Sequence, residues 1–125
     1  MATDISIESE IGGEHPQISH TDFGRVDIRA GRIVKAEPFP KARKPAYKLL
    51  LDFGDSGIKQ SSAQITRRYS CADLIGRTVL AVVNFPPKQV ADFVSEVLVL
   101  GVIAGEGDVV LITPDFEVPL GGRVL

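Results

Sequence analysis

The chain contains the stretch Asp27-Ile28-Arg29-Ala30-Gly31-Arg32-Ile33-Val34, in which apolar side chains alternate with polar ones or with glycine. In an extended chain Val26, Ile28 and Ala30 fall on one side, and the polar residues and Gly31 between them fall on the other. Alternation with a period of two predicts a β-strand with one buried face. Gly31 inside this strand predicts a bulge or a sharp bend, of the kind that a small barrel needs at its corners.

Outward from this strand, further strand-like segments follow one another with turns between them. Tyr47–Phe53 and Ile58–Ile65 are joined by Gly54-Asp55-Ser56-Gly57, a connection so short that it predicts an antiparallel hairpin. Prolines in the stretch 38–45 predict a basic loop before that hairpin. The remaining strands are expected at Thr78–Phe85, Glu96–Ile103 and Asp108–Thr113. Six short strands with frequent turns predict a small all-β barrel or sandwich.

Short helical turns are expected between some of these strands. Thr21 or Asp22 can cap one such turn at the start of the folded region. Ser70 is a plausible cap for a second turn, which Gly76 would end. Pro86-Pro87 breaks the fourth strand, and Lys88 to Phe93 is expected to form a third turn.

Length and composition place the chain among ordinary globular domains. Its 125 residues suit one domain, with 44% hydrophobic and 24% charged residues. No apolar run approaches the ~20 residues of a membrane helix, and the acidic N-terminus does not resemble a signal peptide, so we expect no membrane insertion. The single Cys71 cannot form an internal disulfide, which favours a cytoplasmic location.

Charge is unevenly distributed along the chain. Residues 1–22 carry −5, and residues 23–125 carry +3. Within the second part, residues 25–48 alone carry +6. A positive field of this kind attracts polyanions or acidic segments, but a solvated basic face without a partner is an equally good interpretation.

Groups for catalysis or metal binding are scarce. His15 and His20 are in or next to the predicted tail, and the remainder of the chain offers one cysteine and no histidine. The folded part therefore lacks the histidines and cysteines that a zinc site, or Cys/His or Ser/His catalysis, requires. We expect no catalytic residues, no metal and no cofactor. The segments 59–66 and 84–101 instead join strand-like residues to Lys, Gln and Ser, which is typical of a surface that binds a ligand.

Several motifs together resemble a known family. They are Asp27 to Val34, Phe39-Pro40, Ile58 to Ile65, Val82-Val83-Asn84-Phe85-Pro86-Pro87-Lys88 and Ser95 to Gly101. In this order they resemble a free-standing tRNA-binding OB domain, and the full-length similarity is greatest to the CsaA family of small, export-associated chaperones. The resemblance covers residues 22–125.

The resemblance implies a five-stranded OB-fold barrel with short helical turns and N- and C-terminal extensions. Residues 1–20 would be a disordered acidic tail and residues 21–125 the OB domain. It also implies a symmetric homodimer with Thr21–Val26 and Pro114–Leu125 at the contact. The C-terminal segment is rich in apolar residues, and the alternative to a dimer contact is a strand folded back on the core of its own barrel.

Two ligand classes follow from the resemblance. CsaA-like proteins imply binding of unfolded or presecretory polypeptide, with the Sec export machinery as a further partner, whereas other relatives imply binding of tRNA by shape. In both cases apolar and aromatic side chains would contact the ligand, and basic, amide and hydroxyl groups would bind its polar atoms. The candidate ligand-binding residues are Lys41, Arg43, Tyr47, Lys59, Gln60, Ser61, Gln64, Phe85, Pro86, Lys88, Phe93 and Ser95.

Asp92 bears on the choice between these ligands. It adds a negative charge to the segment that would face phosphate groups, which lowers affinity for RNA by repulsion. The sequence therefore favours a chaperone that binds polypeptide, with structure-specific tRNA binding as the alternative.

Overall fold

The computed structural model describes residues 15–125, and its central element is the strand predicted first. Strand β1 (Ile28–Pro38) pairs on one side with β4 (Thr78–Val82) and on the other with β2 (Tyr47–Asp52), both antiparallel. The register shifts between Ile33 and Lys35, so the irregularity lies beyond Gly31 and not at it. The strand also continues through Pro38, where a loop was expected.

Gly31 has a different role from the one predicted. It is buried, and a Cβ atom placed on it would lie 2.6 Å from Cε1 of Phe53. Gly31 therefore points into the core and gives the Phe53 ring room to pack over the strand, whereas the alternation had placed it on the outer face.

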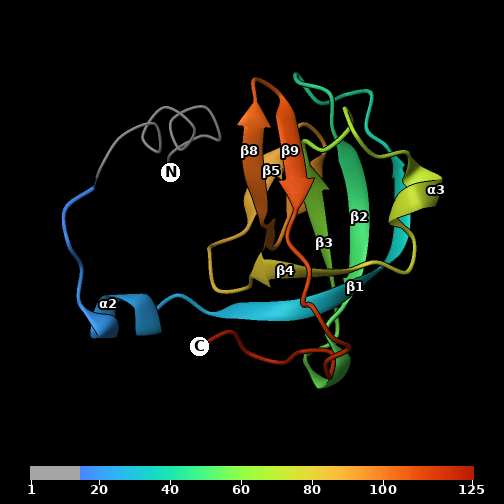
Figure 1. The fold of residues 1–125 in the computed structure, drawn as a ribbon. Helices are drawn as coiled ribbons and strands as arrows, with labels where there is room; N and C mark the ends of the chain where they lie inside the picture. Colours follow the sequence, from blue (N-terminus) through green and yellow to red (C-terminus); the bar gives the residue numbers. More distant parts are fainter. Residues whose placement is uncertain (1–14) are drawn as a thin grey trace.

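Five antiparallel strands form a sheet that is nearly closed into a barrel, which confirms the predicted all-β OB fold. Their order is β3-β2-β1-β4-β7, where β3 is Ile58–Ala63 and β7 is Leu98–Val99. The predicted β2–β3 hairpin is present, with the 3₁₀ turn η1 (Gly54–Ser56) in its loop. Two further hairpins, β5–β6 and β8–β9, complete the fold, and β8–β9 rises beside the barrel (Figure 1).

The two small hairpins replace what the sequence analysis expected there. β5 (Lys88–Val90) and β6 (Phe93–Ser95) form a hairpin where a helical turn was predicted. The predicted strand over residues 96–103 is divided into β7 and β8 (Gly101–Gly105), and β8 pairs with β9 (Asp108–Leu111).

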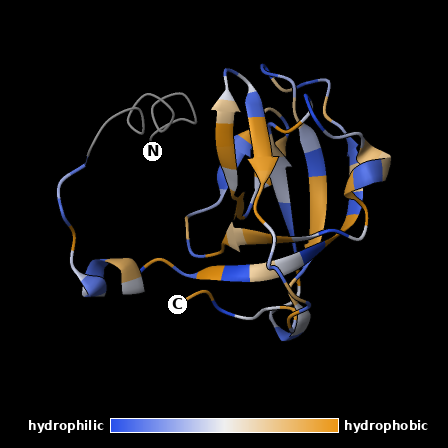
Figure 2. Ribbon diagram, in the orientation of Figure 1, coloured by the Kyte–Doolittle hydropathy of each residue, from blue (hydrophilic) through white to orange (hydrophobic). Residues whose placement is uncertain are grey.

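The core fills the barrel with aliphatic side chains and the ring of Phe53. Phe53, Ile33, Leu49, Leu51, Leu74 and Val79 are essentially inaccessible to solvent. Hydrophobic residues also concentrate along β8 and β9 (Figure 2), and Val109 and Leu111 pack against the core cluster. The hairpin β8–β9 thereby extends the apolar interior to one side of the barrel.

Two short helices have capped starts. Ser70 caps α3 (Cys71–Leu74) as predicted, and Gly76 follows it with a φ of 89°. Helix α2 (His20–Gly24) starts earlier than predicted, because Ser19 and not Thr21 or Asp22 is its cap. Within residues 15–125 no helix is both long and apolar enough to cross a membrane.

The C-terminal segment lies along β1. Gly121 N–H donates to the Ala30 carbonyl at 2.8 Å, and Val124 N–H donates to the Ile28 carbonyl at 2.9 Å. The segment passes below the barrel in Figure 1, whereas α2 stands to one side of it. Phe116 and Leu125 nevertheless stay exposed. The part of the predicted tail that covers residues 1–14 lies outside the described residues.

Candidate ligand-binding cleft

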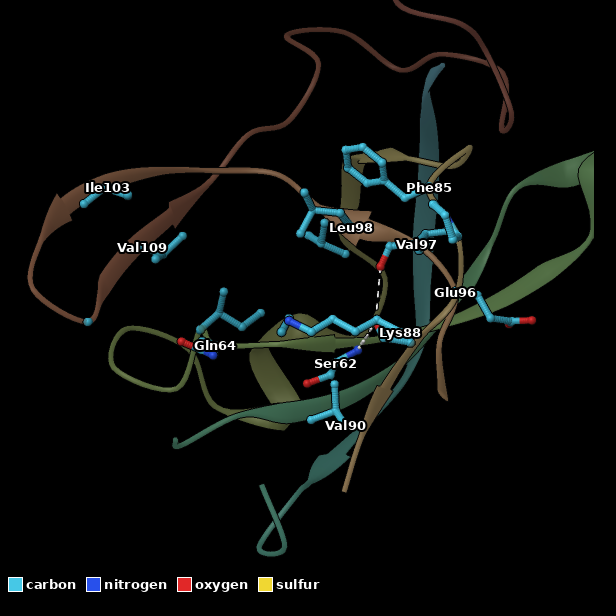
Figure 3. Close-up of a pocket in the computed structure, with 16 residues that line it drawn as sticks. Ser62, Gln64, Phe85, Lys88, Val90, Glu96, Val97, Leu98, Ile103 and Val109 are labelled. Carbon is cyan, nitrogen blue, oxygen red and sulfur yellow. Dashed lines mark hydrogen bonds between the residues drawn. The ribbon is translucent and has the colours of Figure 1, made fainter. Parts of the chain in front are cut away.

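An apolar cleft of about 210 Å³ opens beside the line where the barrel closes. One wall is the end of β3 and the residues after it, and the other is the segment that leads from β6 into β7 (Figure 3). The cleft is smaller than the ~300–1,000 Å³ of a pocket that encloses a small molecule. The lining residues are Ser62, Ala63, Gln64, Ile65, Phe85, Pro86, Lys88, Val90, Ser95, Glu96, Val97, Leu98, Val99, Ile103, Gly107 and Val109.

The closing line of the barrel, here called the seam, joins β3 to residues 94–97. The Glu96 N–H donates to the Gln60 carbonyl at 2.8 Å. In return the Gln60 N–H donates to the Glu96 carboxylate at 2.9 Å, and the Gln60 side chain donates to the Val94 carbonyl at 2.7 Å. Ser62 N–H donates to the Ser95 hydroxyl at 3.0 Å. Side chains therefore take over much of the pairing that a regular strand ladder would supply.

Five predicted residues meet at the cleft: Gln64, Phe85, Pro86, Lys88 and Ser95. Figure 3 shows the Lys88 side chain extended across it, with Gln64 at one end and Phe85 at the other. Phe85 is 48% exposed, which is high for a phenylalanine and leaves it accessible to a ligand.

Asn84 fixes the loop that presents Phe85 and Pro86. Its side-chain oxygen accepts from Asp27 N–H at 2.9 Å, and its side-chain nitrogen donates to the Arg25 carbonyl at 2.7 Å. These bonds tie the end of β4 to the residues before β1, so the loop has a fixed place at the cleft.

Gln60 and Phe93 line a second, smaller hollow of about 120 Å³. Lys41 lies near it, where it pairs with Asp92. The Phe93 ring meets the Phe39 ring edge-on, with 5.5 Å between centroids. The Lys48 ammonium lies 4.9 Å from the Phe39 ring centre and 5.5 Å from the Phe93 ring centre, so it makes cation–π contacts with both.

Lys41 and Asp92 form an ion pair beside these aromatic rings. Their side chains are 2.9 Å apart. The hydrogen bond raises the pKa of the Lys41 ammonium and lowers the pKa of the Asp92 carboxyl. The negative charge of Asp92 is thus paired with Lys41, and its predicted effect on RNA affinity stays a prediction.

The other predicted residues are spread over the barrel. Ser61 is completely buried, and its hydroxyl donates to the Val97 carbonyl at 3.0 Å. Tyr47 donates to the Tyr69 carbonyl at 2.7 Å, and burial raises the pKa of its hydroxyl, with smaller contributions from neighbouring groups. Arg43 and Lys59 are exposed, on the loop after β1 and on β3, and neither lines the cleft.

The sequence analysis did not identify the apolar residues that line most of the cleft. Val90, Leu98 and Val99 come from β5 and β7, and Ile103 and Val109 come from the β8–β9 hairpin. In the sequence these residues are ordinary strand positions. They line one cleft only because the β8–β9 hairpin lies beside the barrel and brings Ile103 and Val109 to the other three residues.

Polar contacts hold the β8–β9 hairpin in that place. The Arg68 guanidinium forms a two-pronged ion pair with the Asp108 carboxylate. Arg67 donates to the Glu106 carbonyl at 2.9 Å, and the Tyr69 hydroxyl accepts from Leu111 N–H at 3.0 Å. The segment after β3 therefore supports the wall that carries Ile103.

The chain is therefore a small OB-fold domain with an apolar cleft at the seam of its five-stranded barrel. Residues 28–123 match the family described as "Putative tRNA binding domain". The chain belongs to this tRNA-binding OB-domain family, in the branch that contains the CsaA chaperones. This confirms the family that the sequence motifs indicated.

Solved structures of that branch are similar to this chain over their whole length. The chaperone CsaA of Bacillus anthracis str. Ames is 53% identical with a TM-score of 0.85, and the match covers 88% of this chain and 100% of that one. The CsaA chaperone protein of Picrophilus torridus is 52% identical with a TM-score of 0.81, covering 87% of this chain and 100% of that one.

Curated relatives include large enzymes of which this chain matches a small part. The methionine–tRNA ligase of Methanocaldococcus jannaschii is 32% identical over 117 residues, which are 94% of this chain and 18% of the ligase. The chain thus spans less than a fifth of the length of such curated relatives.

Proposed function

We propose that this protein is a chaperone that binds unfolded or presecretory polypeptide and assists protein export. The apolar cleft carries the proposal, because its walls are mainly aliphatic and the Phe85 ring is open to solvent beside them. Exposed apolar surface that is concave and bordered by polar groups is typical of a site for another apolar chain. The similarity to two CsaA chaperones supports the same function.

The polar groups at the cleft suit a polypeptide as well. Lys88 attracts acidic side chains or carbonyl oxygens, and Gln64 can both donate and accept hydrogen bonds. The main chain of Ser62 lies next to the apolar walls. The cleft therefore offers apolar contacts together with hydrogen bonds to a peptide backbone.

Our proposal includes a symmetric homodimer that acts in the cytoplasm, with the Sec export machinery as partner. Phe23, Phe116 and Leu125 support the dimer, because these large apolar side chains are exposed on the two terminal segments. Sedimentation over a concentration series should give twice the mass of the chain. A monomer at every concentration would exclude this part of the proposal.

An aggregation assay tests the chaperone function. The purified protein should slow the aggregation of a reduced, permanently unfolded client protein. Ile103 and Val102 are adjacent exposed apolar residues on β8, but only Ile103 lines the cleft. Ile103→Ser should therefore weaken the protection, whereas Val102→Ser removes a similar exposed side chain and should retain it. Equal loss in both variants, or no protection by the parent protein, would contradict the proposal.

Binding of tRNA is the second candidate function, supported by the family match and by the ligase relatives. Lysines and arginines of the loop after β1 would then bind phosphate groups. Phosphate-driven binding weakens steeply with salt, so affinity for tRNA should fall strongly between low salt and about 150 mM. A flat salt response would exclude phosphate contacts as the source of binding. Tight tRNA binding at the higher salt without client protection would replace the chaperone proposal.

A further inference from the structure

At the seam the outer edge of β3 is covered by one main-chain bond, from the Glu96 N–H to the Gln60 carbonyl, and by side chains. β3 is the last strand of the five-stranded sheet and pairs with β2 on one side only. On its other side the Gln60 N–H binds the Glu96 carboxylate, and the Ser62 N–H binds the Ser95 hydroxyl. An uncovered strand edge invites pairing with another chain, and side chains of this kind satisfy it until such a chain arrives.

The cleft begins where this cover ends. Ser62 and Ser95 are both lining residues, and the wall continues along Gln64 and Ile65. The Ser62 N–H donates to the Ser95 hydroxyl at 3.0 Å, whereas Figure 3 shows the Glu96 side chain pointing away from the cleft. A ligand can therefore reach this edge from Ser62 onward. The first main-chain donor there is the Ser62 N–H, which is hydrogen-bonded to the Ser95 hydroxyl.

We infer that polypeptide binds in the cleft as an added β-strand on the edge of β3, and that it displaces the Ser95 hydroxyl from the Ser62 N–H. The inference rests on the proposed function and specifies how the same cleft recognises its ligand. A carbonyl of the bound chain accepts the Ser62 N–H, and alternate side chains of that strand point into the apolar cleft.

This exchange leaves no polar group unpaired. The Ser95 hydroxyl also donates to the Val97 carbonyl at 3.3 Å, so it keeps a partner after the Ser62 N–H has turned to the ligand. A hydroxyl carries one donor and two acceptor sites, and losing the bond to Ser62 frees only an acceptor. Because one hydrogen bond replaces another of similar strength, the exchange costs little free energy.

Strand addition also explains how one cleft can accept many sequences. Main-chain hydrogen bonds are the same for every residue except proline, so they supply affinity without regard to sequence. Cleft residues such as Leu98 and Val109 then select for apolar side chains at every second position. The cleft is too small for a folded partner, but it suits a few side chains of an extended one.

Backbone methylation of a peptide tests the inference. The probe is a short, fluorescently labelled peptide in which Leu and Ser alternate between terminal Lys residues. Each amide is methylated in turn, which removes one N–H and keeps every side chain. Binding should weaken by about tenfold at alternate amides within the part of the peptide that pairs with the stretch from Ser62 onward, the loss expected for one main-chain bond, and should stay nearly constant at the other amides.

The outcomes separate this inference from the proposed function. If the unmodified peptide binds and methylation has the same effect at all positions, strand addition is wrong while polypeptide binding stands. If neither the unmodified peptide nor an unfolded client binds, the proposed function itself fails.

Hydrogen exchange at the Ser62 amide gives an independent readout on the protein. Ser95→Ala should speed exchange of this amide in the free protein, because the hydroxyl that accepts its hydrogen is gone. Added peptide should slow exchange of the Ser62 amide again. The Ser95→Ala variant should bind the peptide with an affinity equal to or above that of the parent protein. Ser56→Ala, in the distant turn η1, is the matched control and should change neither quantity. A loss of peptide affinity confined to Ser95→Ala would show that the Ser95 hydroxyl binds the ligand itself. That result would contradict the proposed displacement of this hydroxyl from the Ser62 N–H.

Discussion

Gly31 shows how a single missing side chain shapes this barrel. The Phe53 ring occupies the space above it, and the ring is fully buried. Gly31→Ala should destabilise the protein by about 1–3 kcal/mol, the usual cost of forcing extra volume into a packed core. Urea unfolding measures this change. Gly24→Ala is the control, because nothing lies within 4 Å of its added Cβ, and an equal loss in both variants would contradict the packing argument.

Ser61 is a residue whose role changed between sequence and structure. Its pattern suggested ligand contact, but its hydroxyl is buried and bound to the Val97 carbonyl. Ser61→Ala should lower the free energy of unfolding by about 1 kcal/mol, since one buried hydrogen bond is lost while the Ser95 hydroxyl still reaches the same carbonyl. Thermal unfolding and peptide titration should show lower stability with unchanged affinity. Unchanged stability with lost affinity would restore the first interpretation.

At the scale of elements, the β5–β6 hairpin is fastened by its tip. Lys41 pairs with Asp92 there, and Phe93 packs against Phe39. The pKa of Asp92 is lowered, so its contribution to stability is present above the ordinary carboxyl pKa and is lost as pH falls through the lowered value. The pKa of Lys41 is raised, so its contribution is lost only as pH rises through that raised value. The hairpin should be held firmly across neutral pH.

Carbon NMR of the Asp92 carboxyl tests this fastening. Lys41→Ala should raise the pKa of Asp92 toward its ordinary value and should loosen the hairpin amides, measured by hydrogen exchange at neutral pH. Lys35→Ala removes another exposed lysine, which pairs with Glu37, and should leave Asp92 unchanged. If Asp92 titrates normally in the parent protein, the pair does not form in solution.

The same hairpin shows where prediction from sequence reaches its limit. The long strands and the Ser70 cap depend on local patterns, and both were predictable. Residues 88–93 looked helical after Pro86-Pro87, yet they form a hairpin whose turn holds Ala91 at a φ of 51°. Contacts with Lys41 and Phe39 favour that turn, and these lie more than forty residues away in the chain.

The candidate site was predictable only in part for the same reason. Phe85, Lys88 and Ser95 stand in conspicuous motifs and do line the cleft. Ile103 and Val109 line it because the β8–β9 hairpin is held against the segment after β3, by bonds such as that between Arg68 and Asp108. No local pattern encodes that docking, so the apolar half of the site stays hidden until the fold is known.

At the scale of the whole molecule, charge separates the chain into two parts. Residues 1–14 carry four acidic side chains and no lysine or arginine, so removing them changes the net charge from −2 to +2. The basic loop after β1 then acts on approaching anionic ligands within a chain whose net charge is positive. Long-range attraction of this kind raises association rates at low salt and is screened at high salt.

Removal of residues 1–14 should therefore speed association with tRNA at low salt, with a smaller effect at about 150 mM because the Debye length there is only about 8 Å. Stopped-flow fluorescence with labelled tRNA measures the rate, and a labelled Leu-Ser peptide without the terminal Lys residues, which has no charged side chain, should respond much less. A matched variant keeps the full length and replaces the four carboxylates by amides. Equal acceleration in both variants assigns the effect to charge, whereas acceleration only after truncation would assign it to the removal of the segment itself and refute the electrostatic argument.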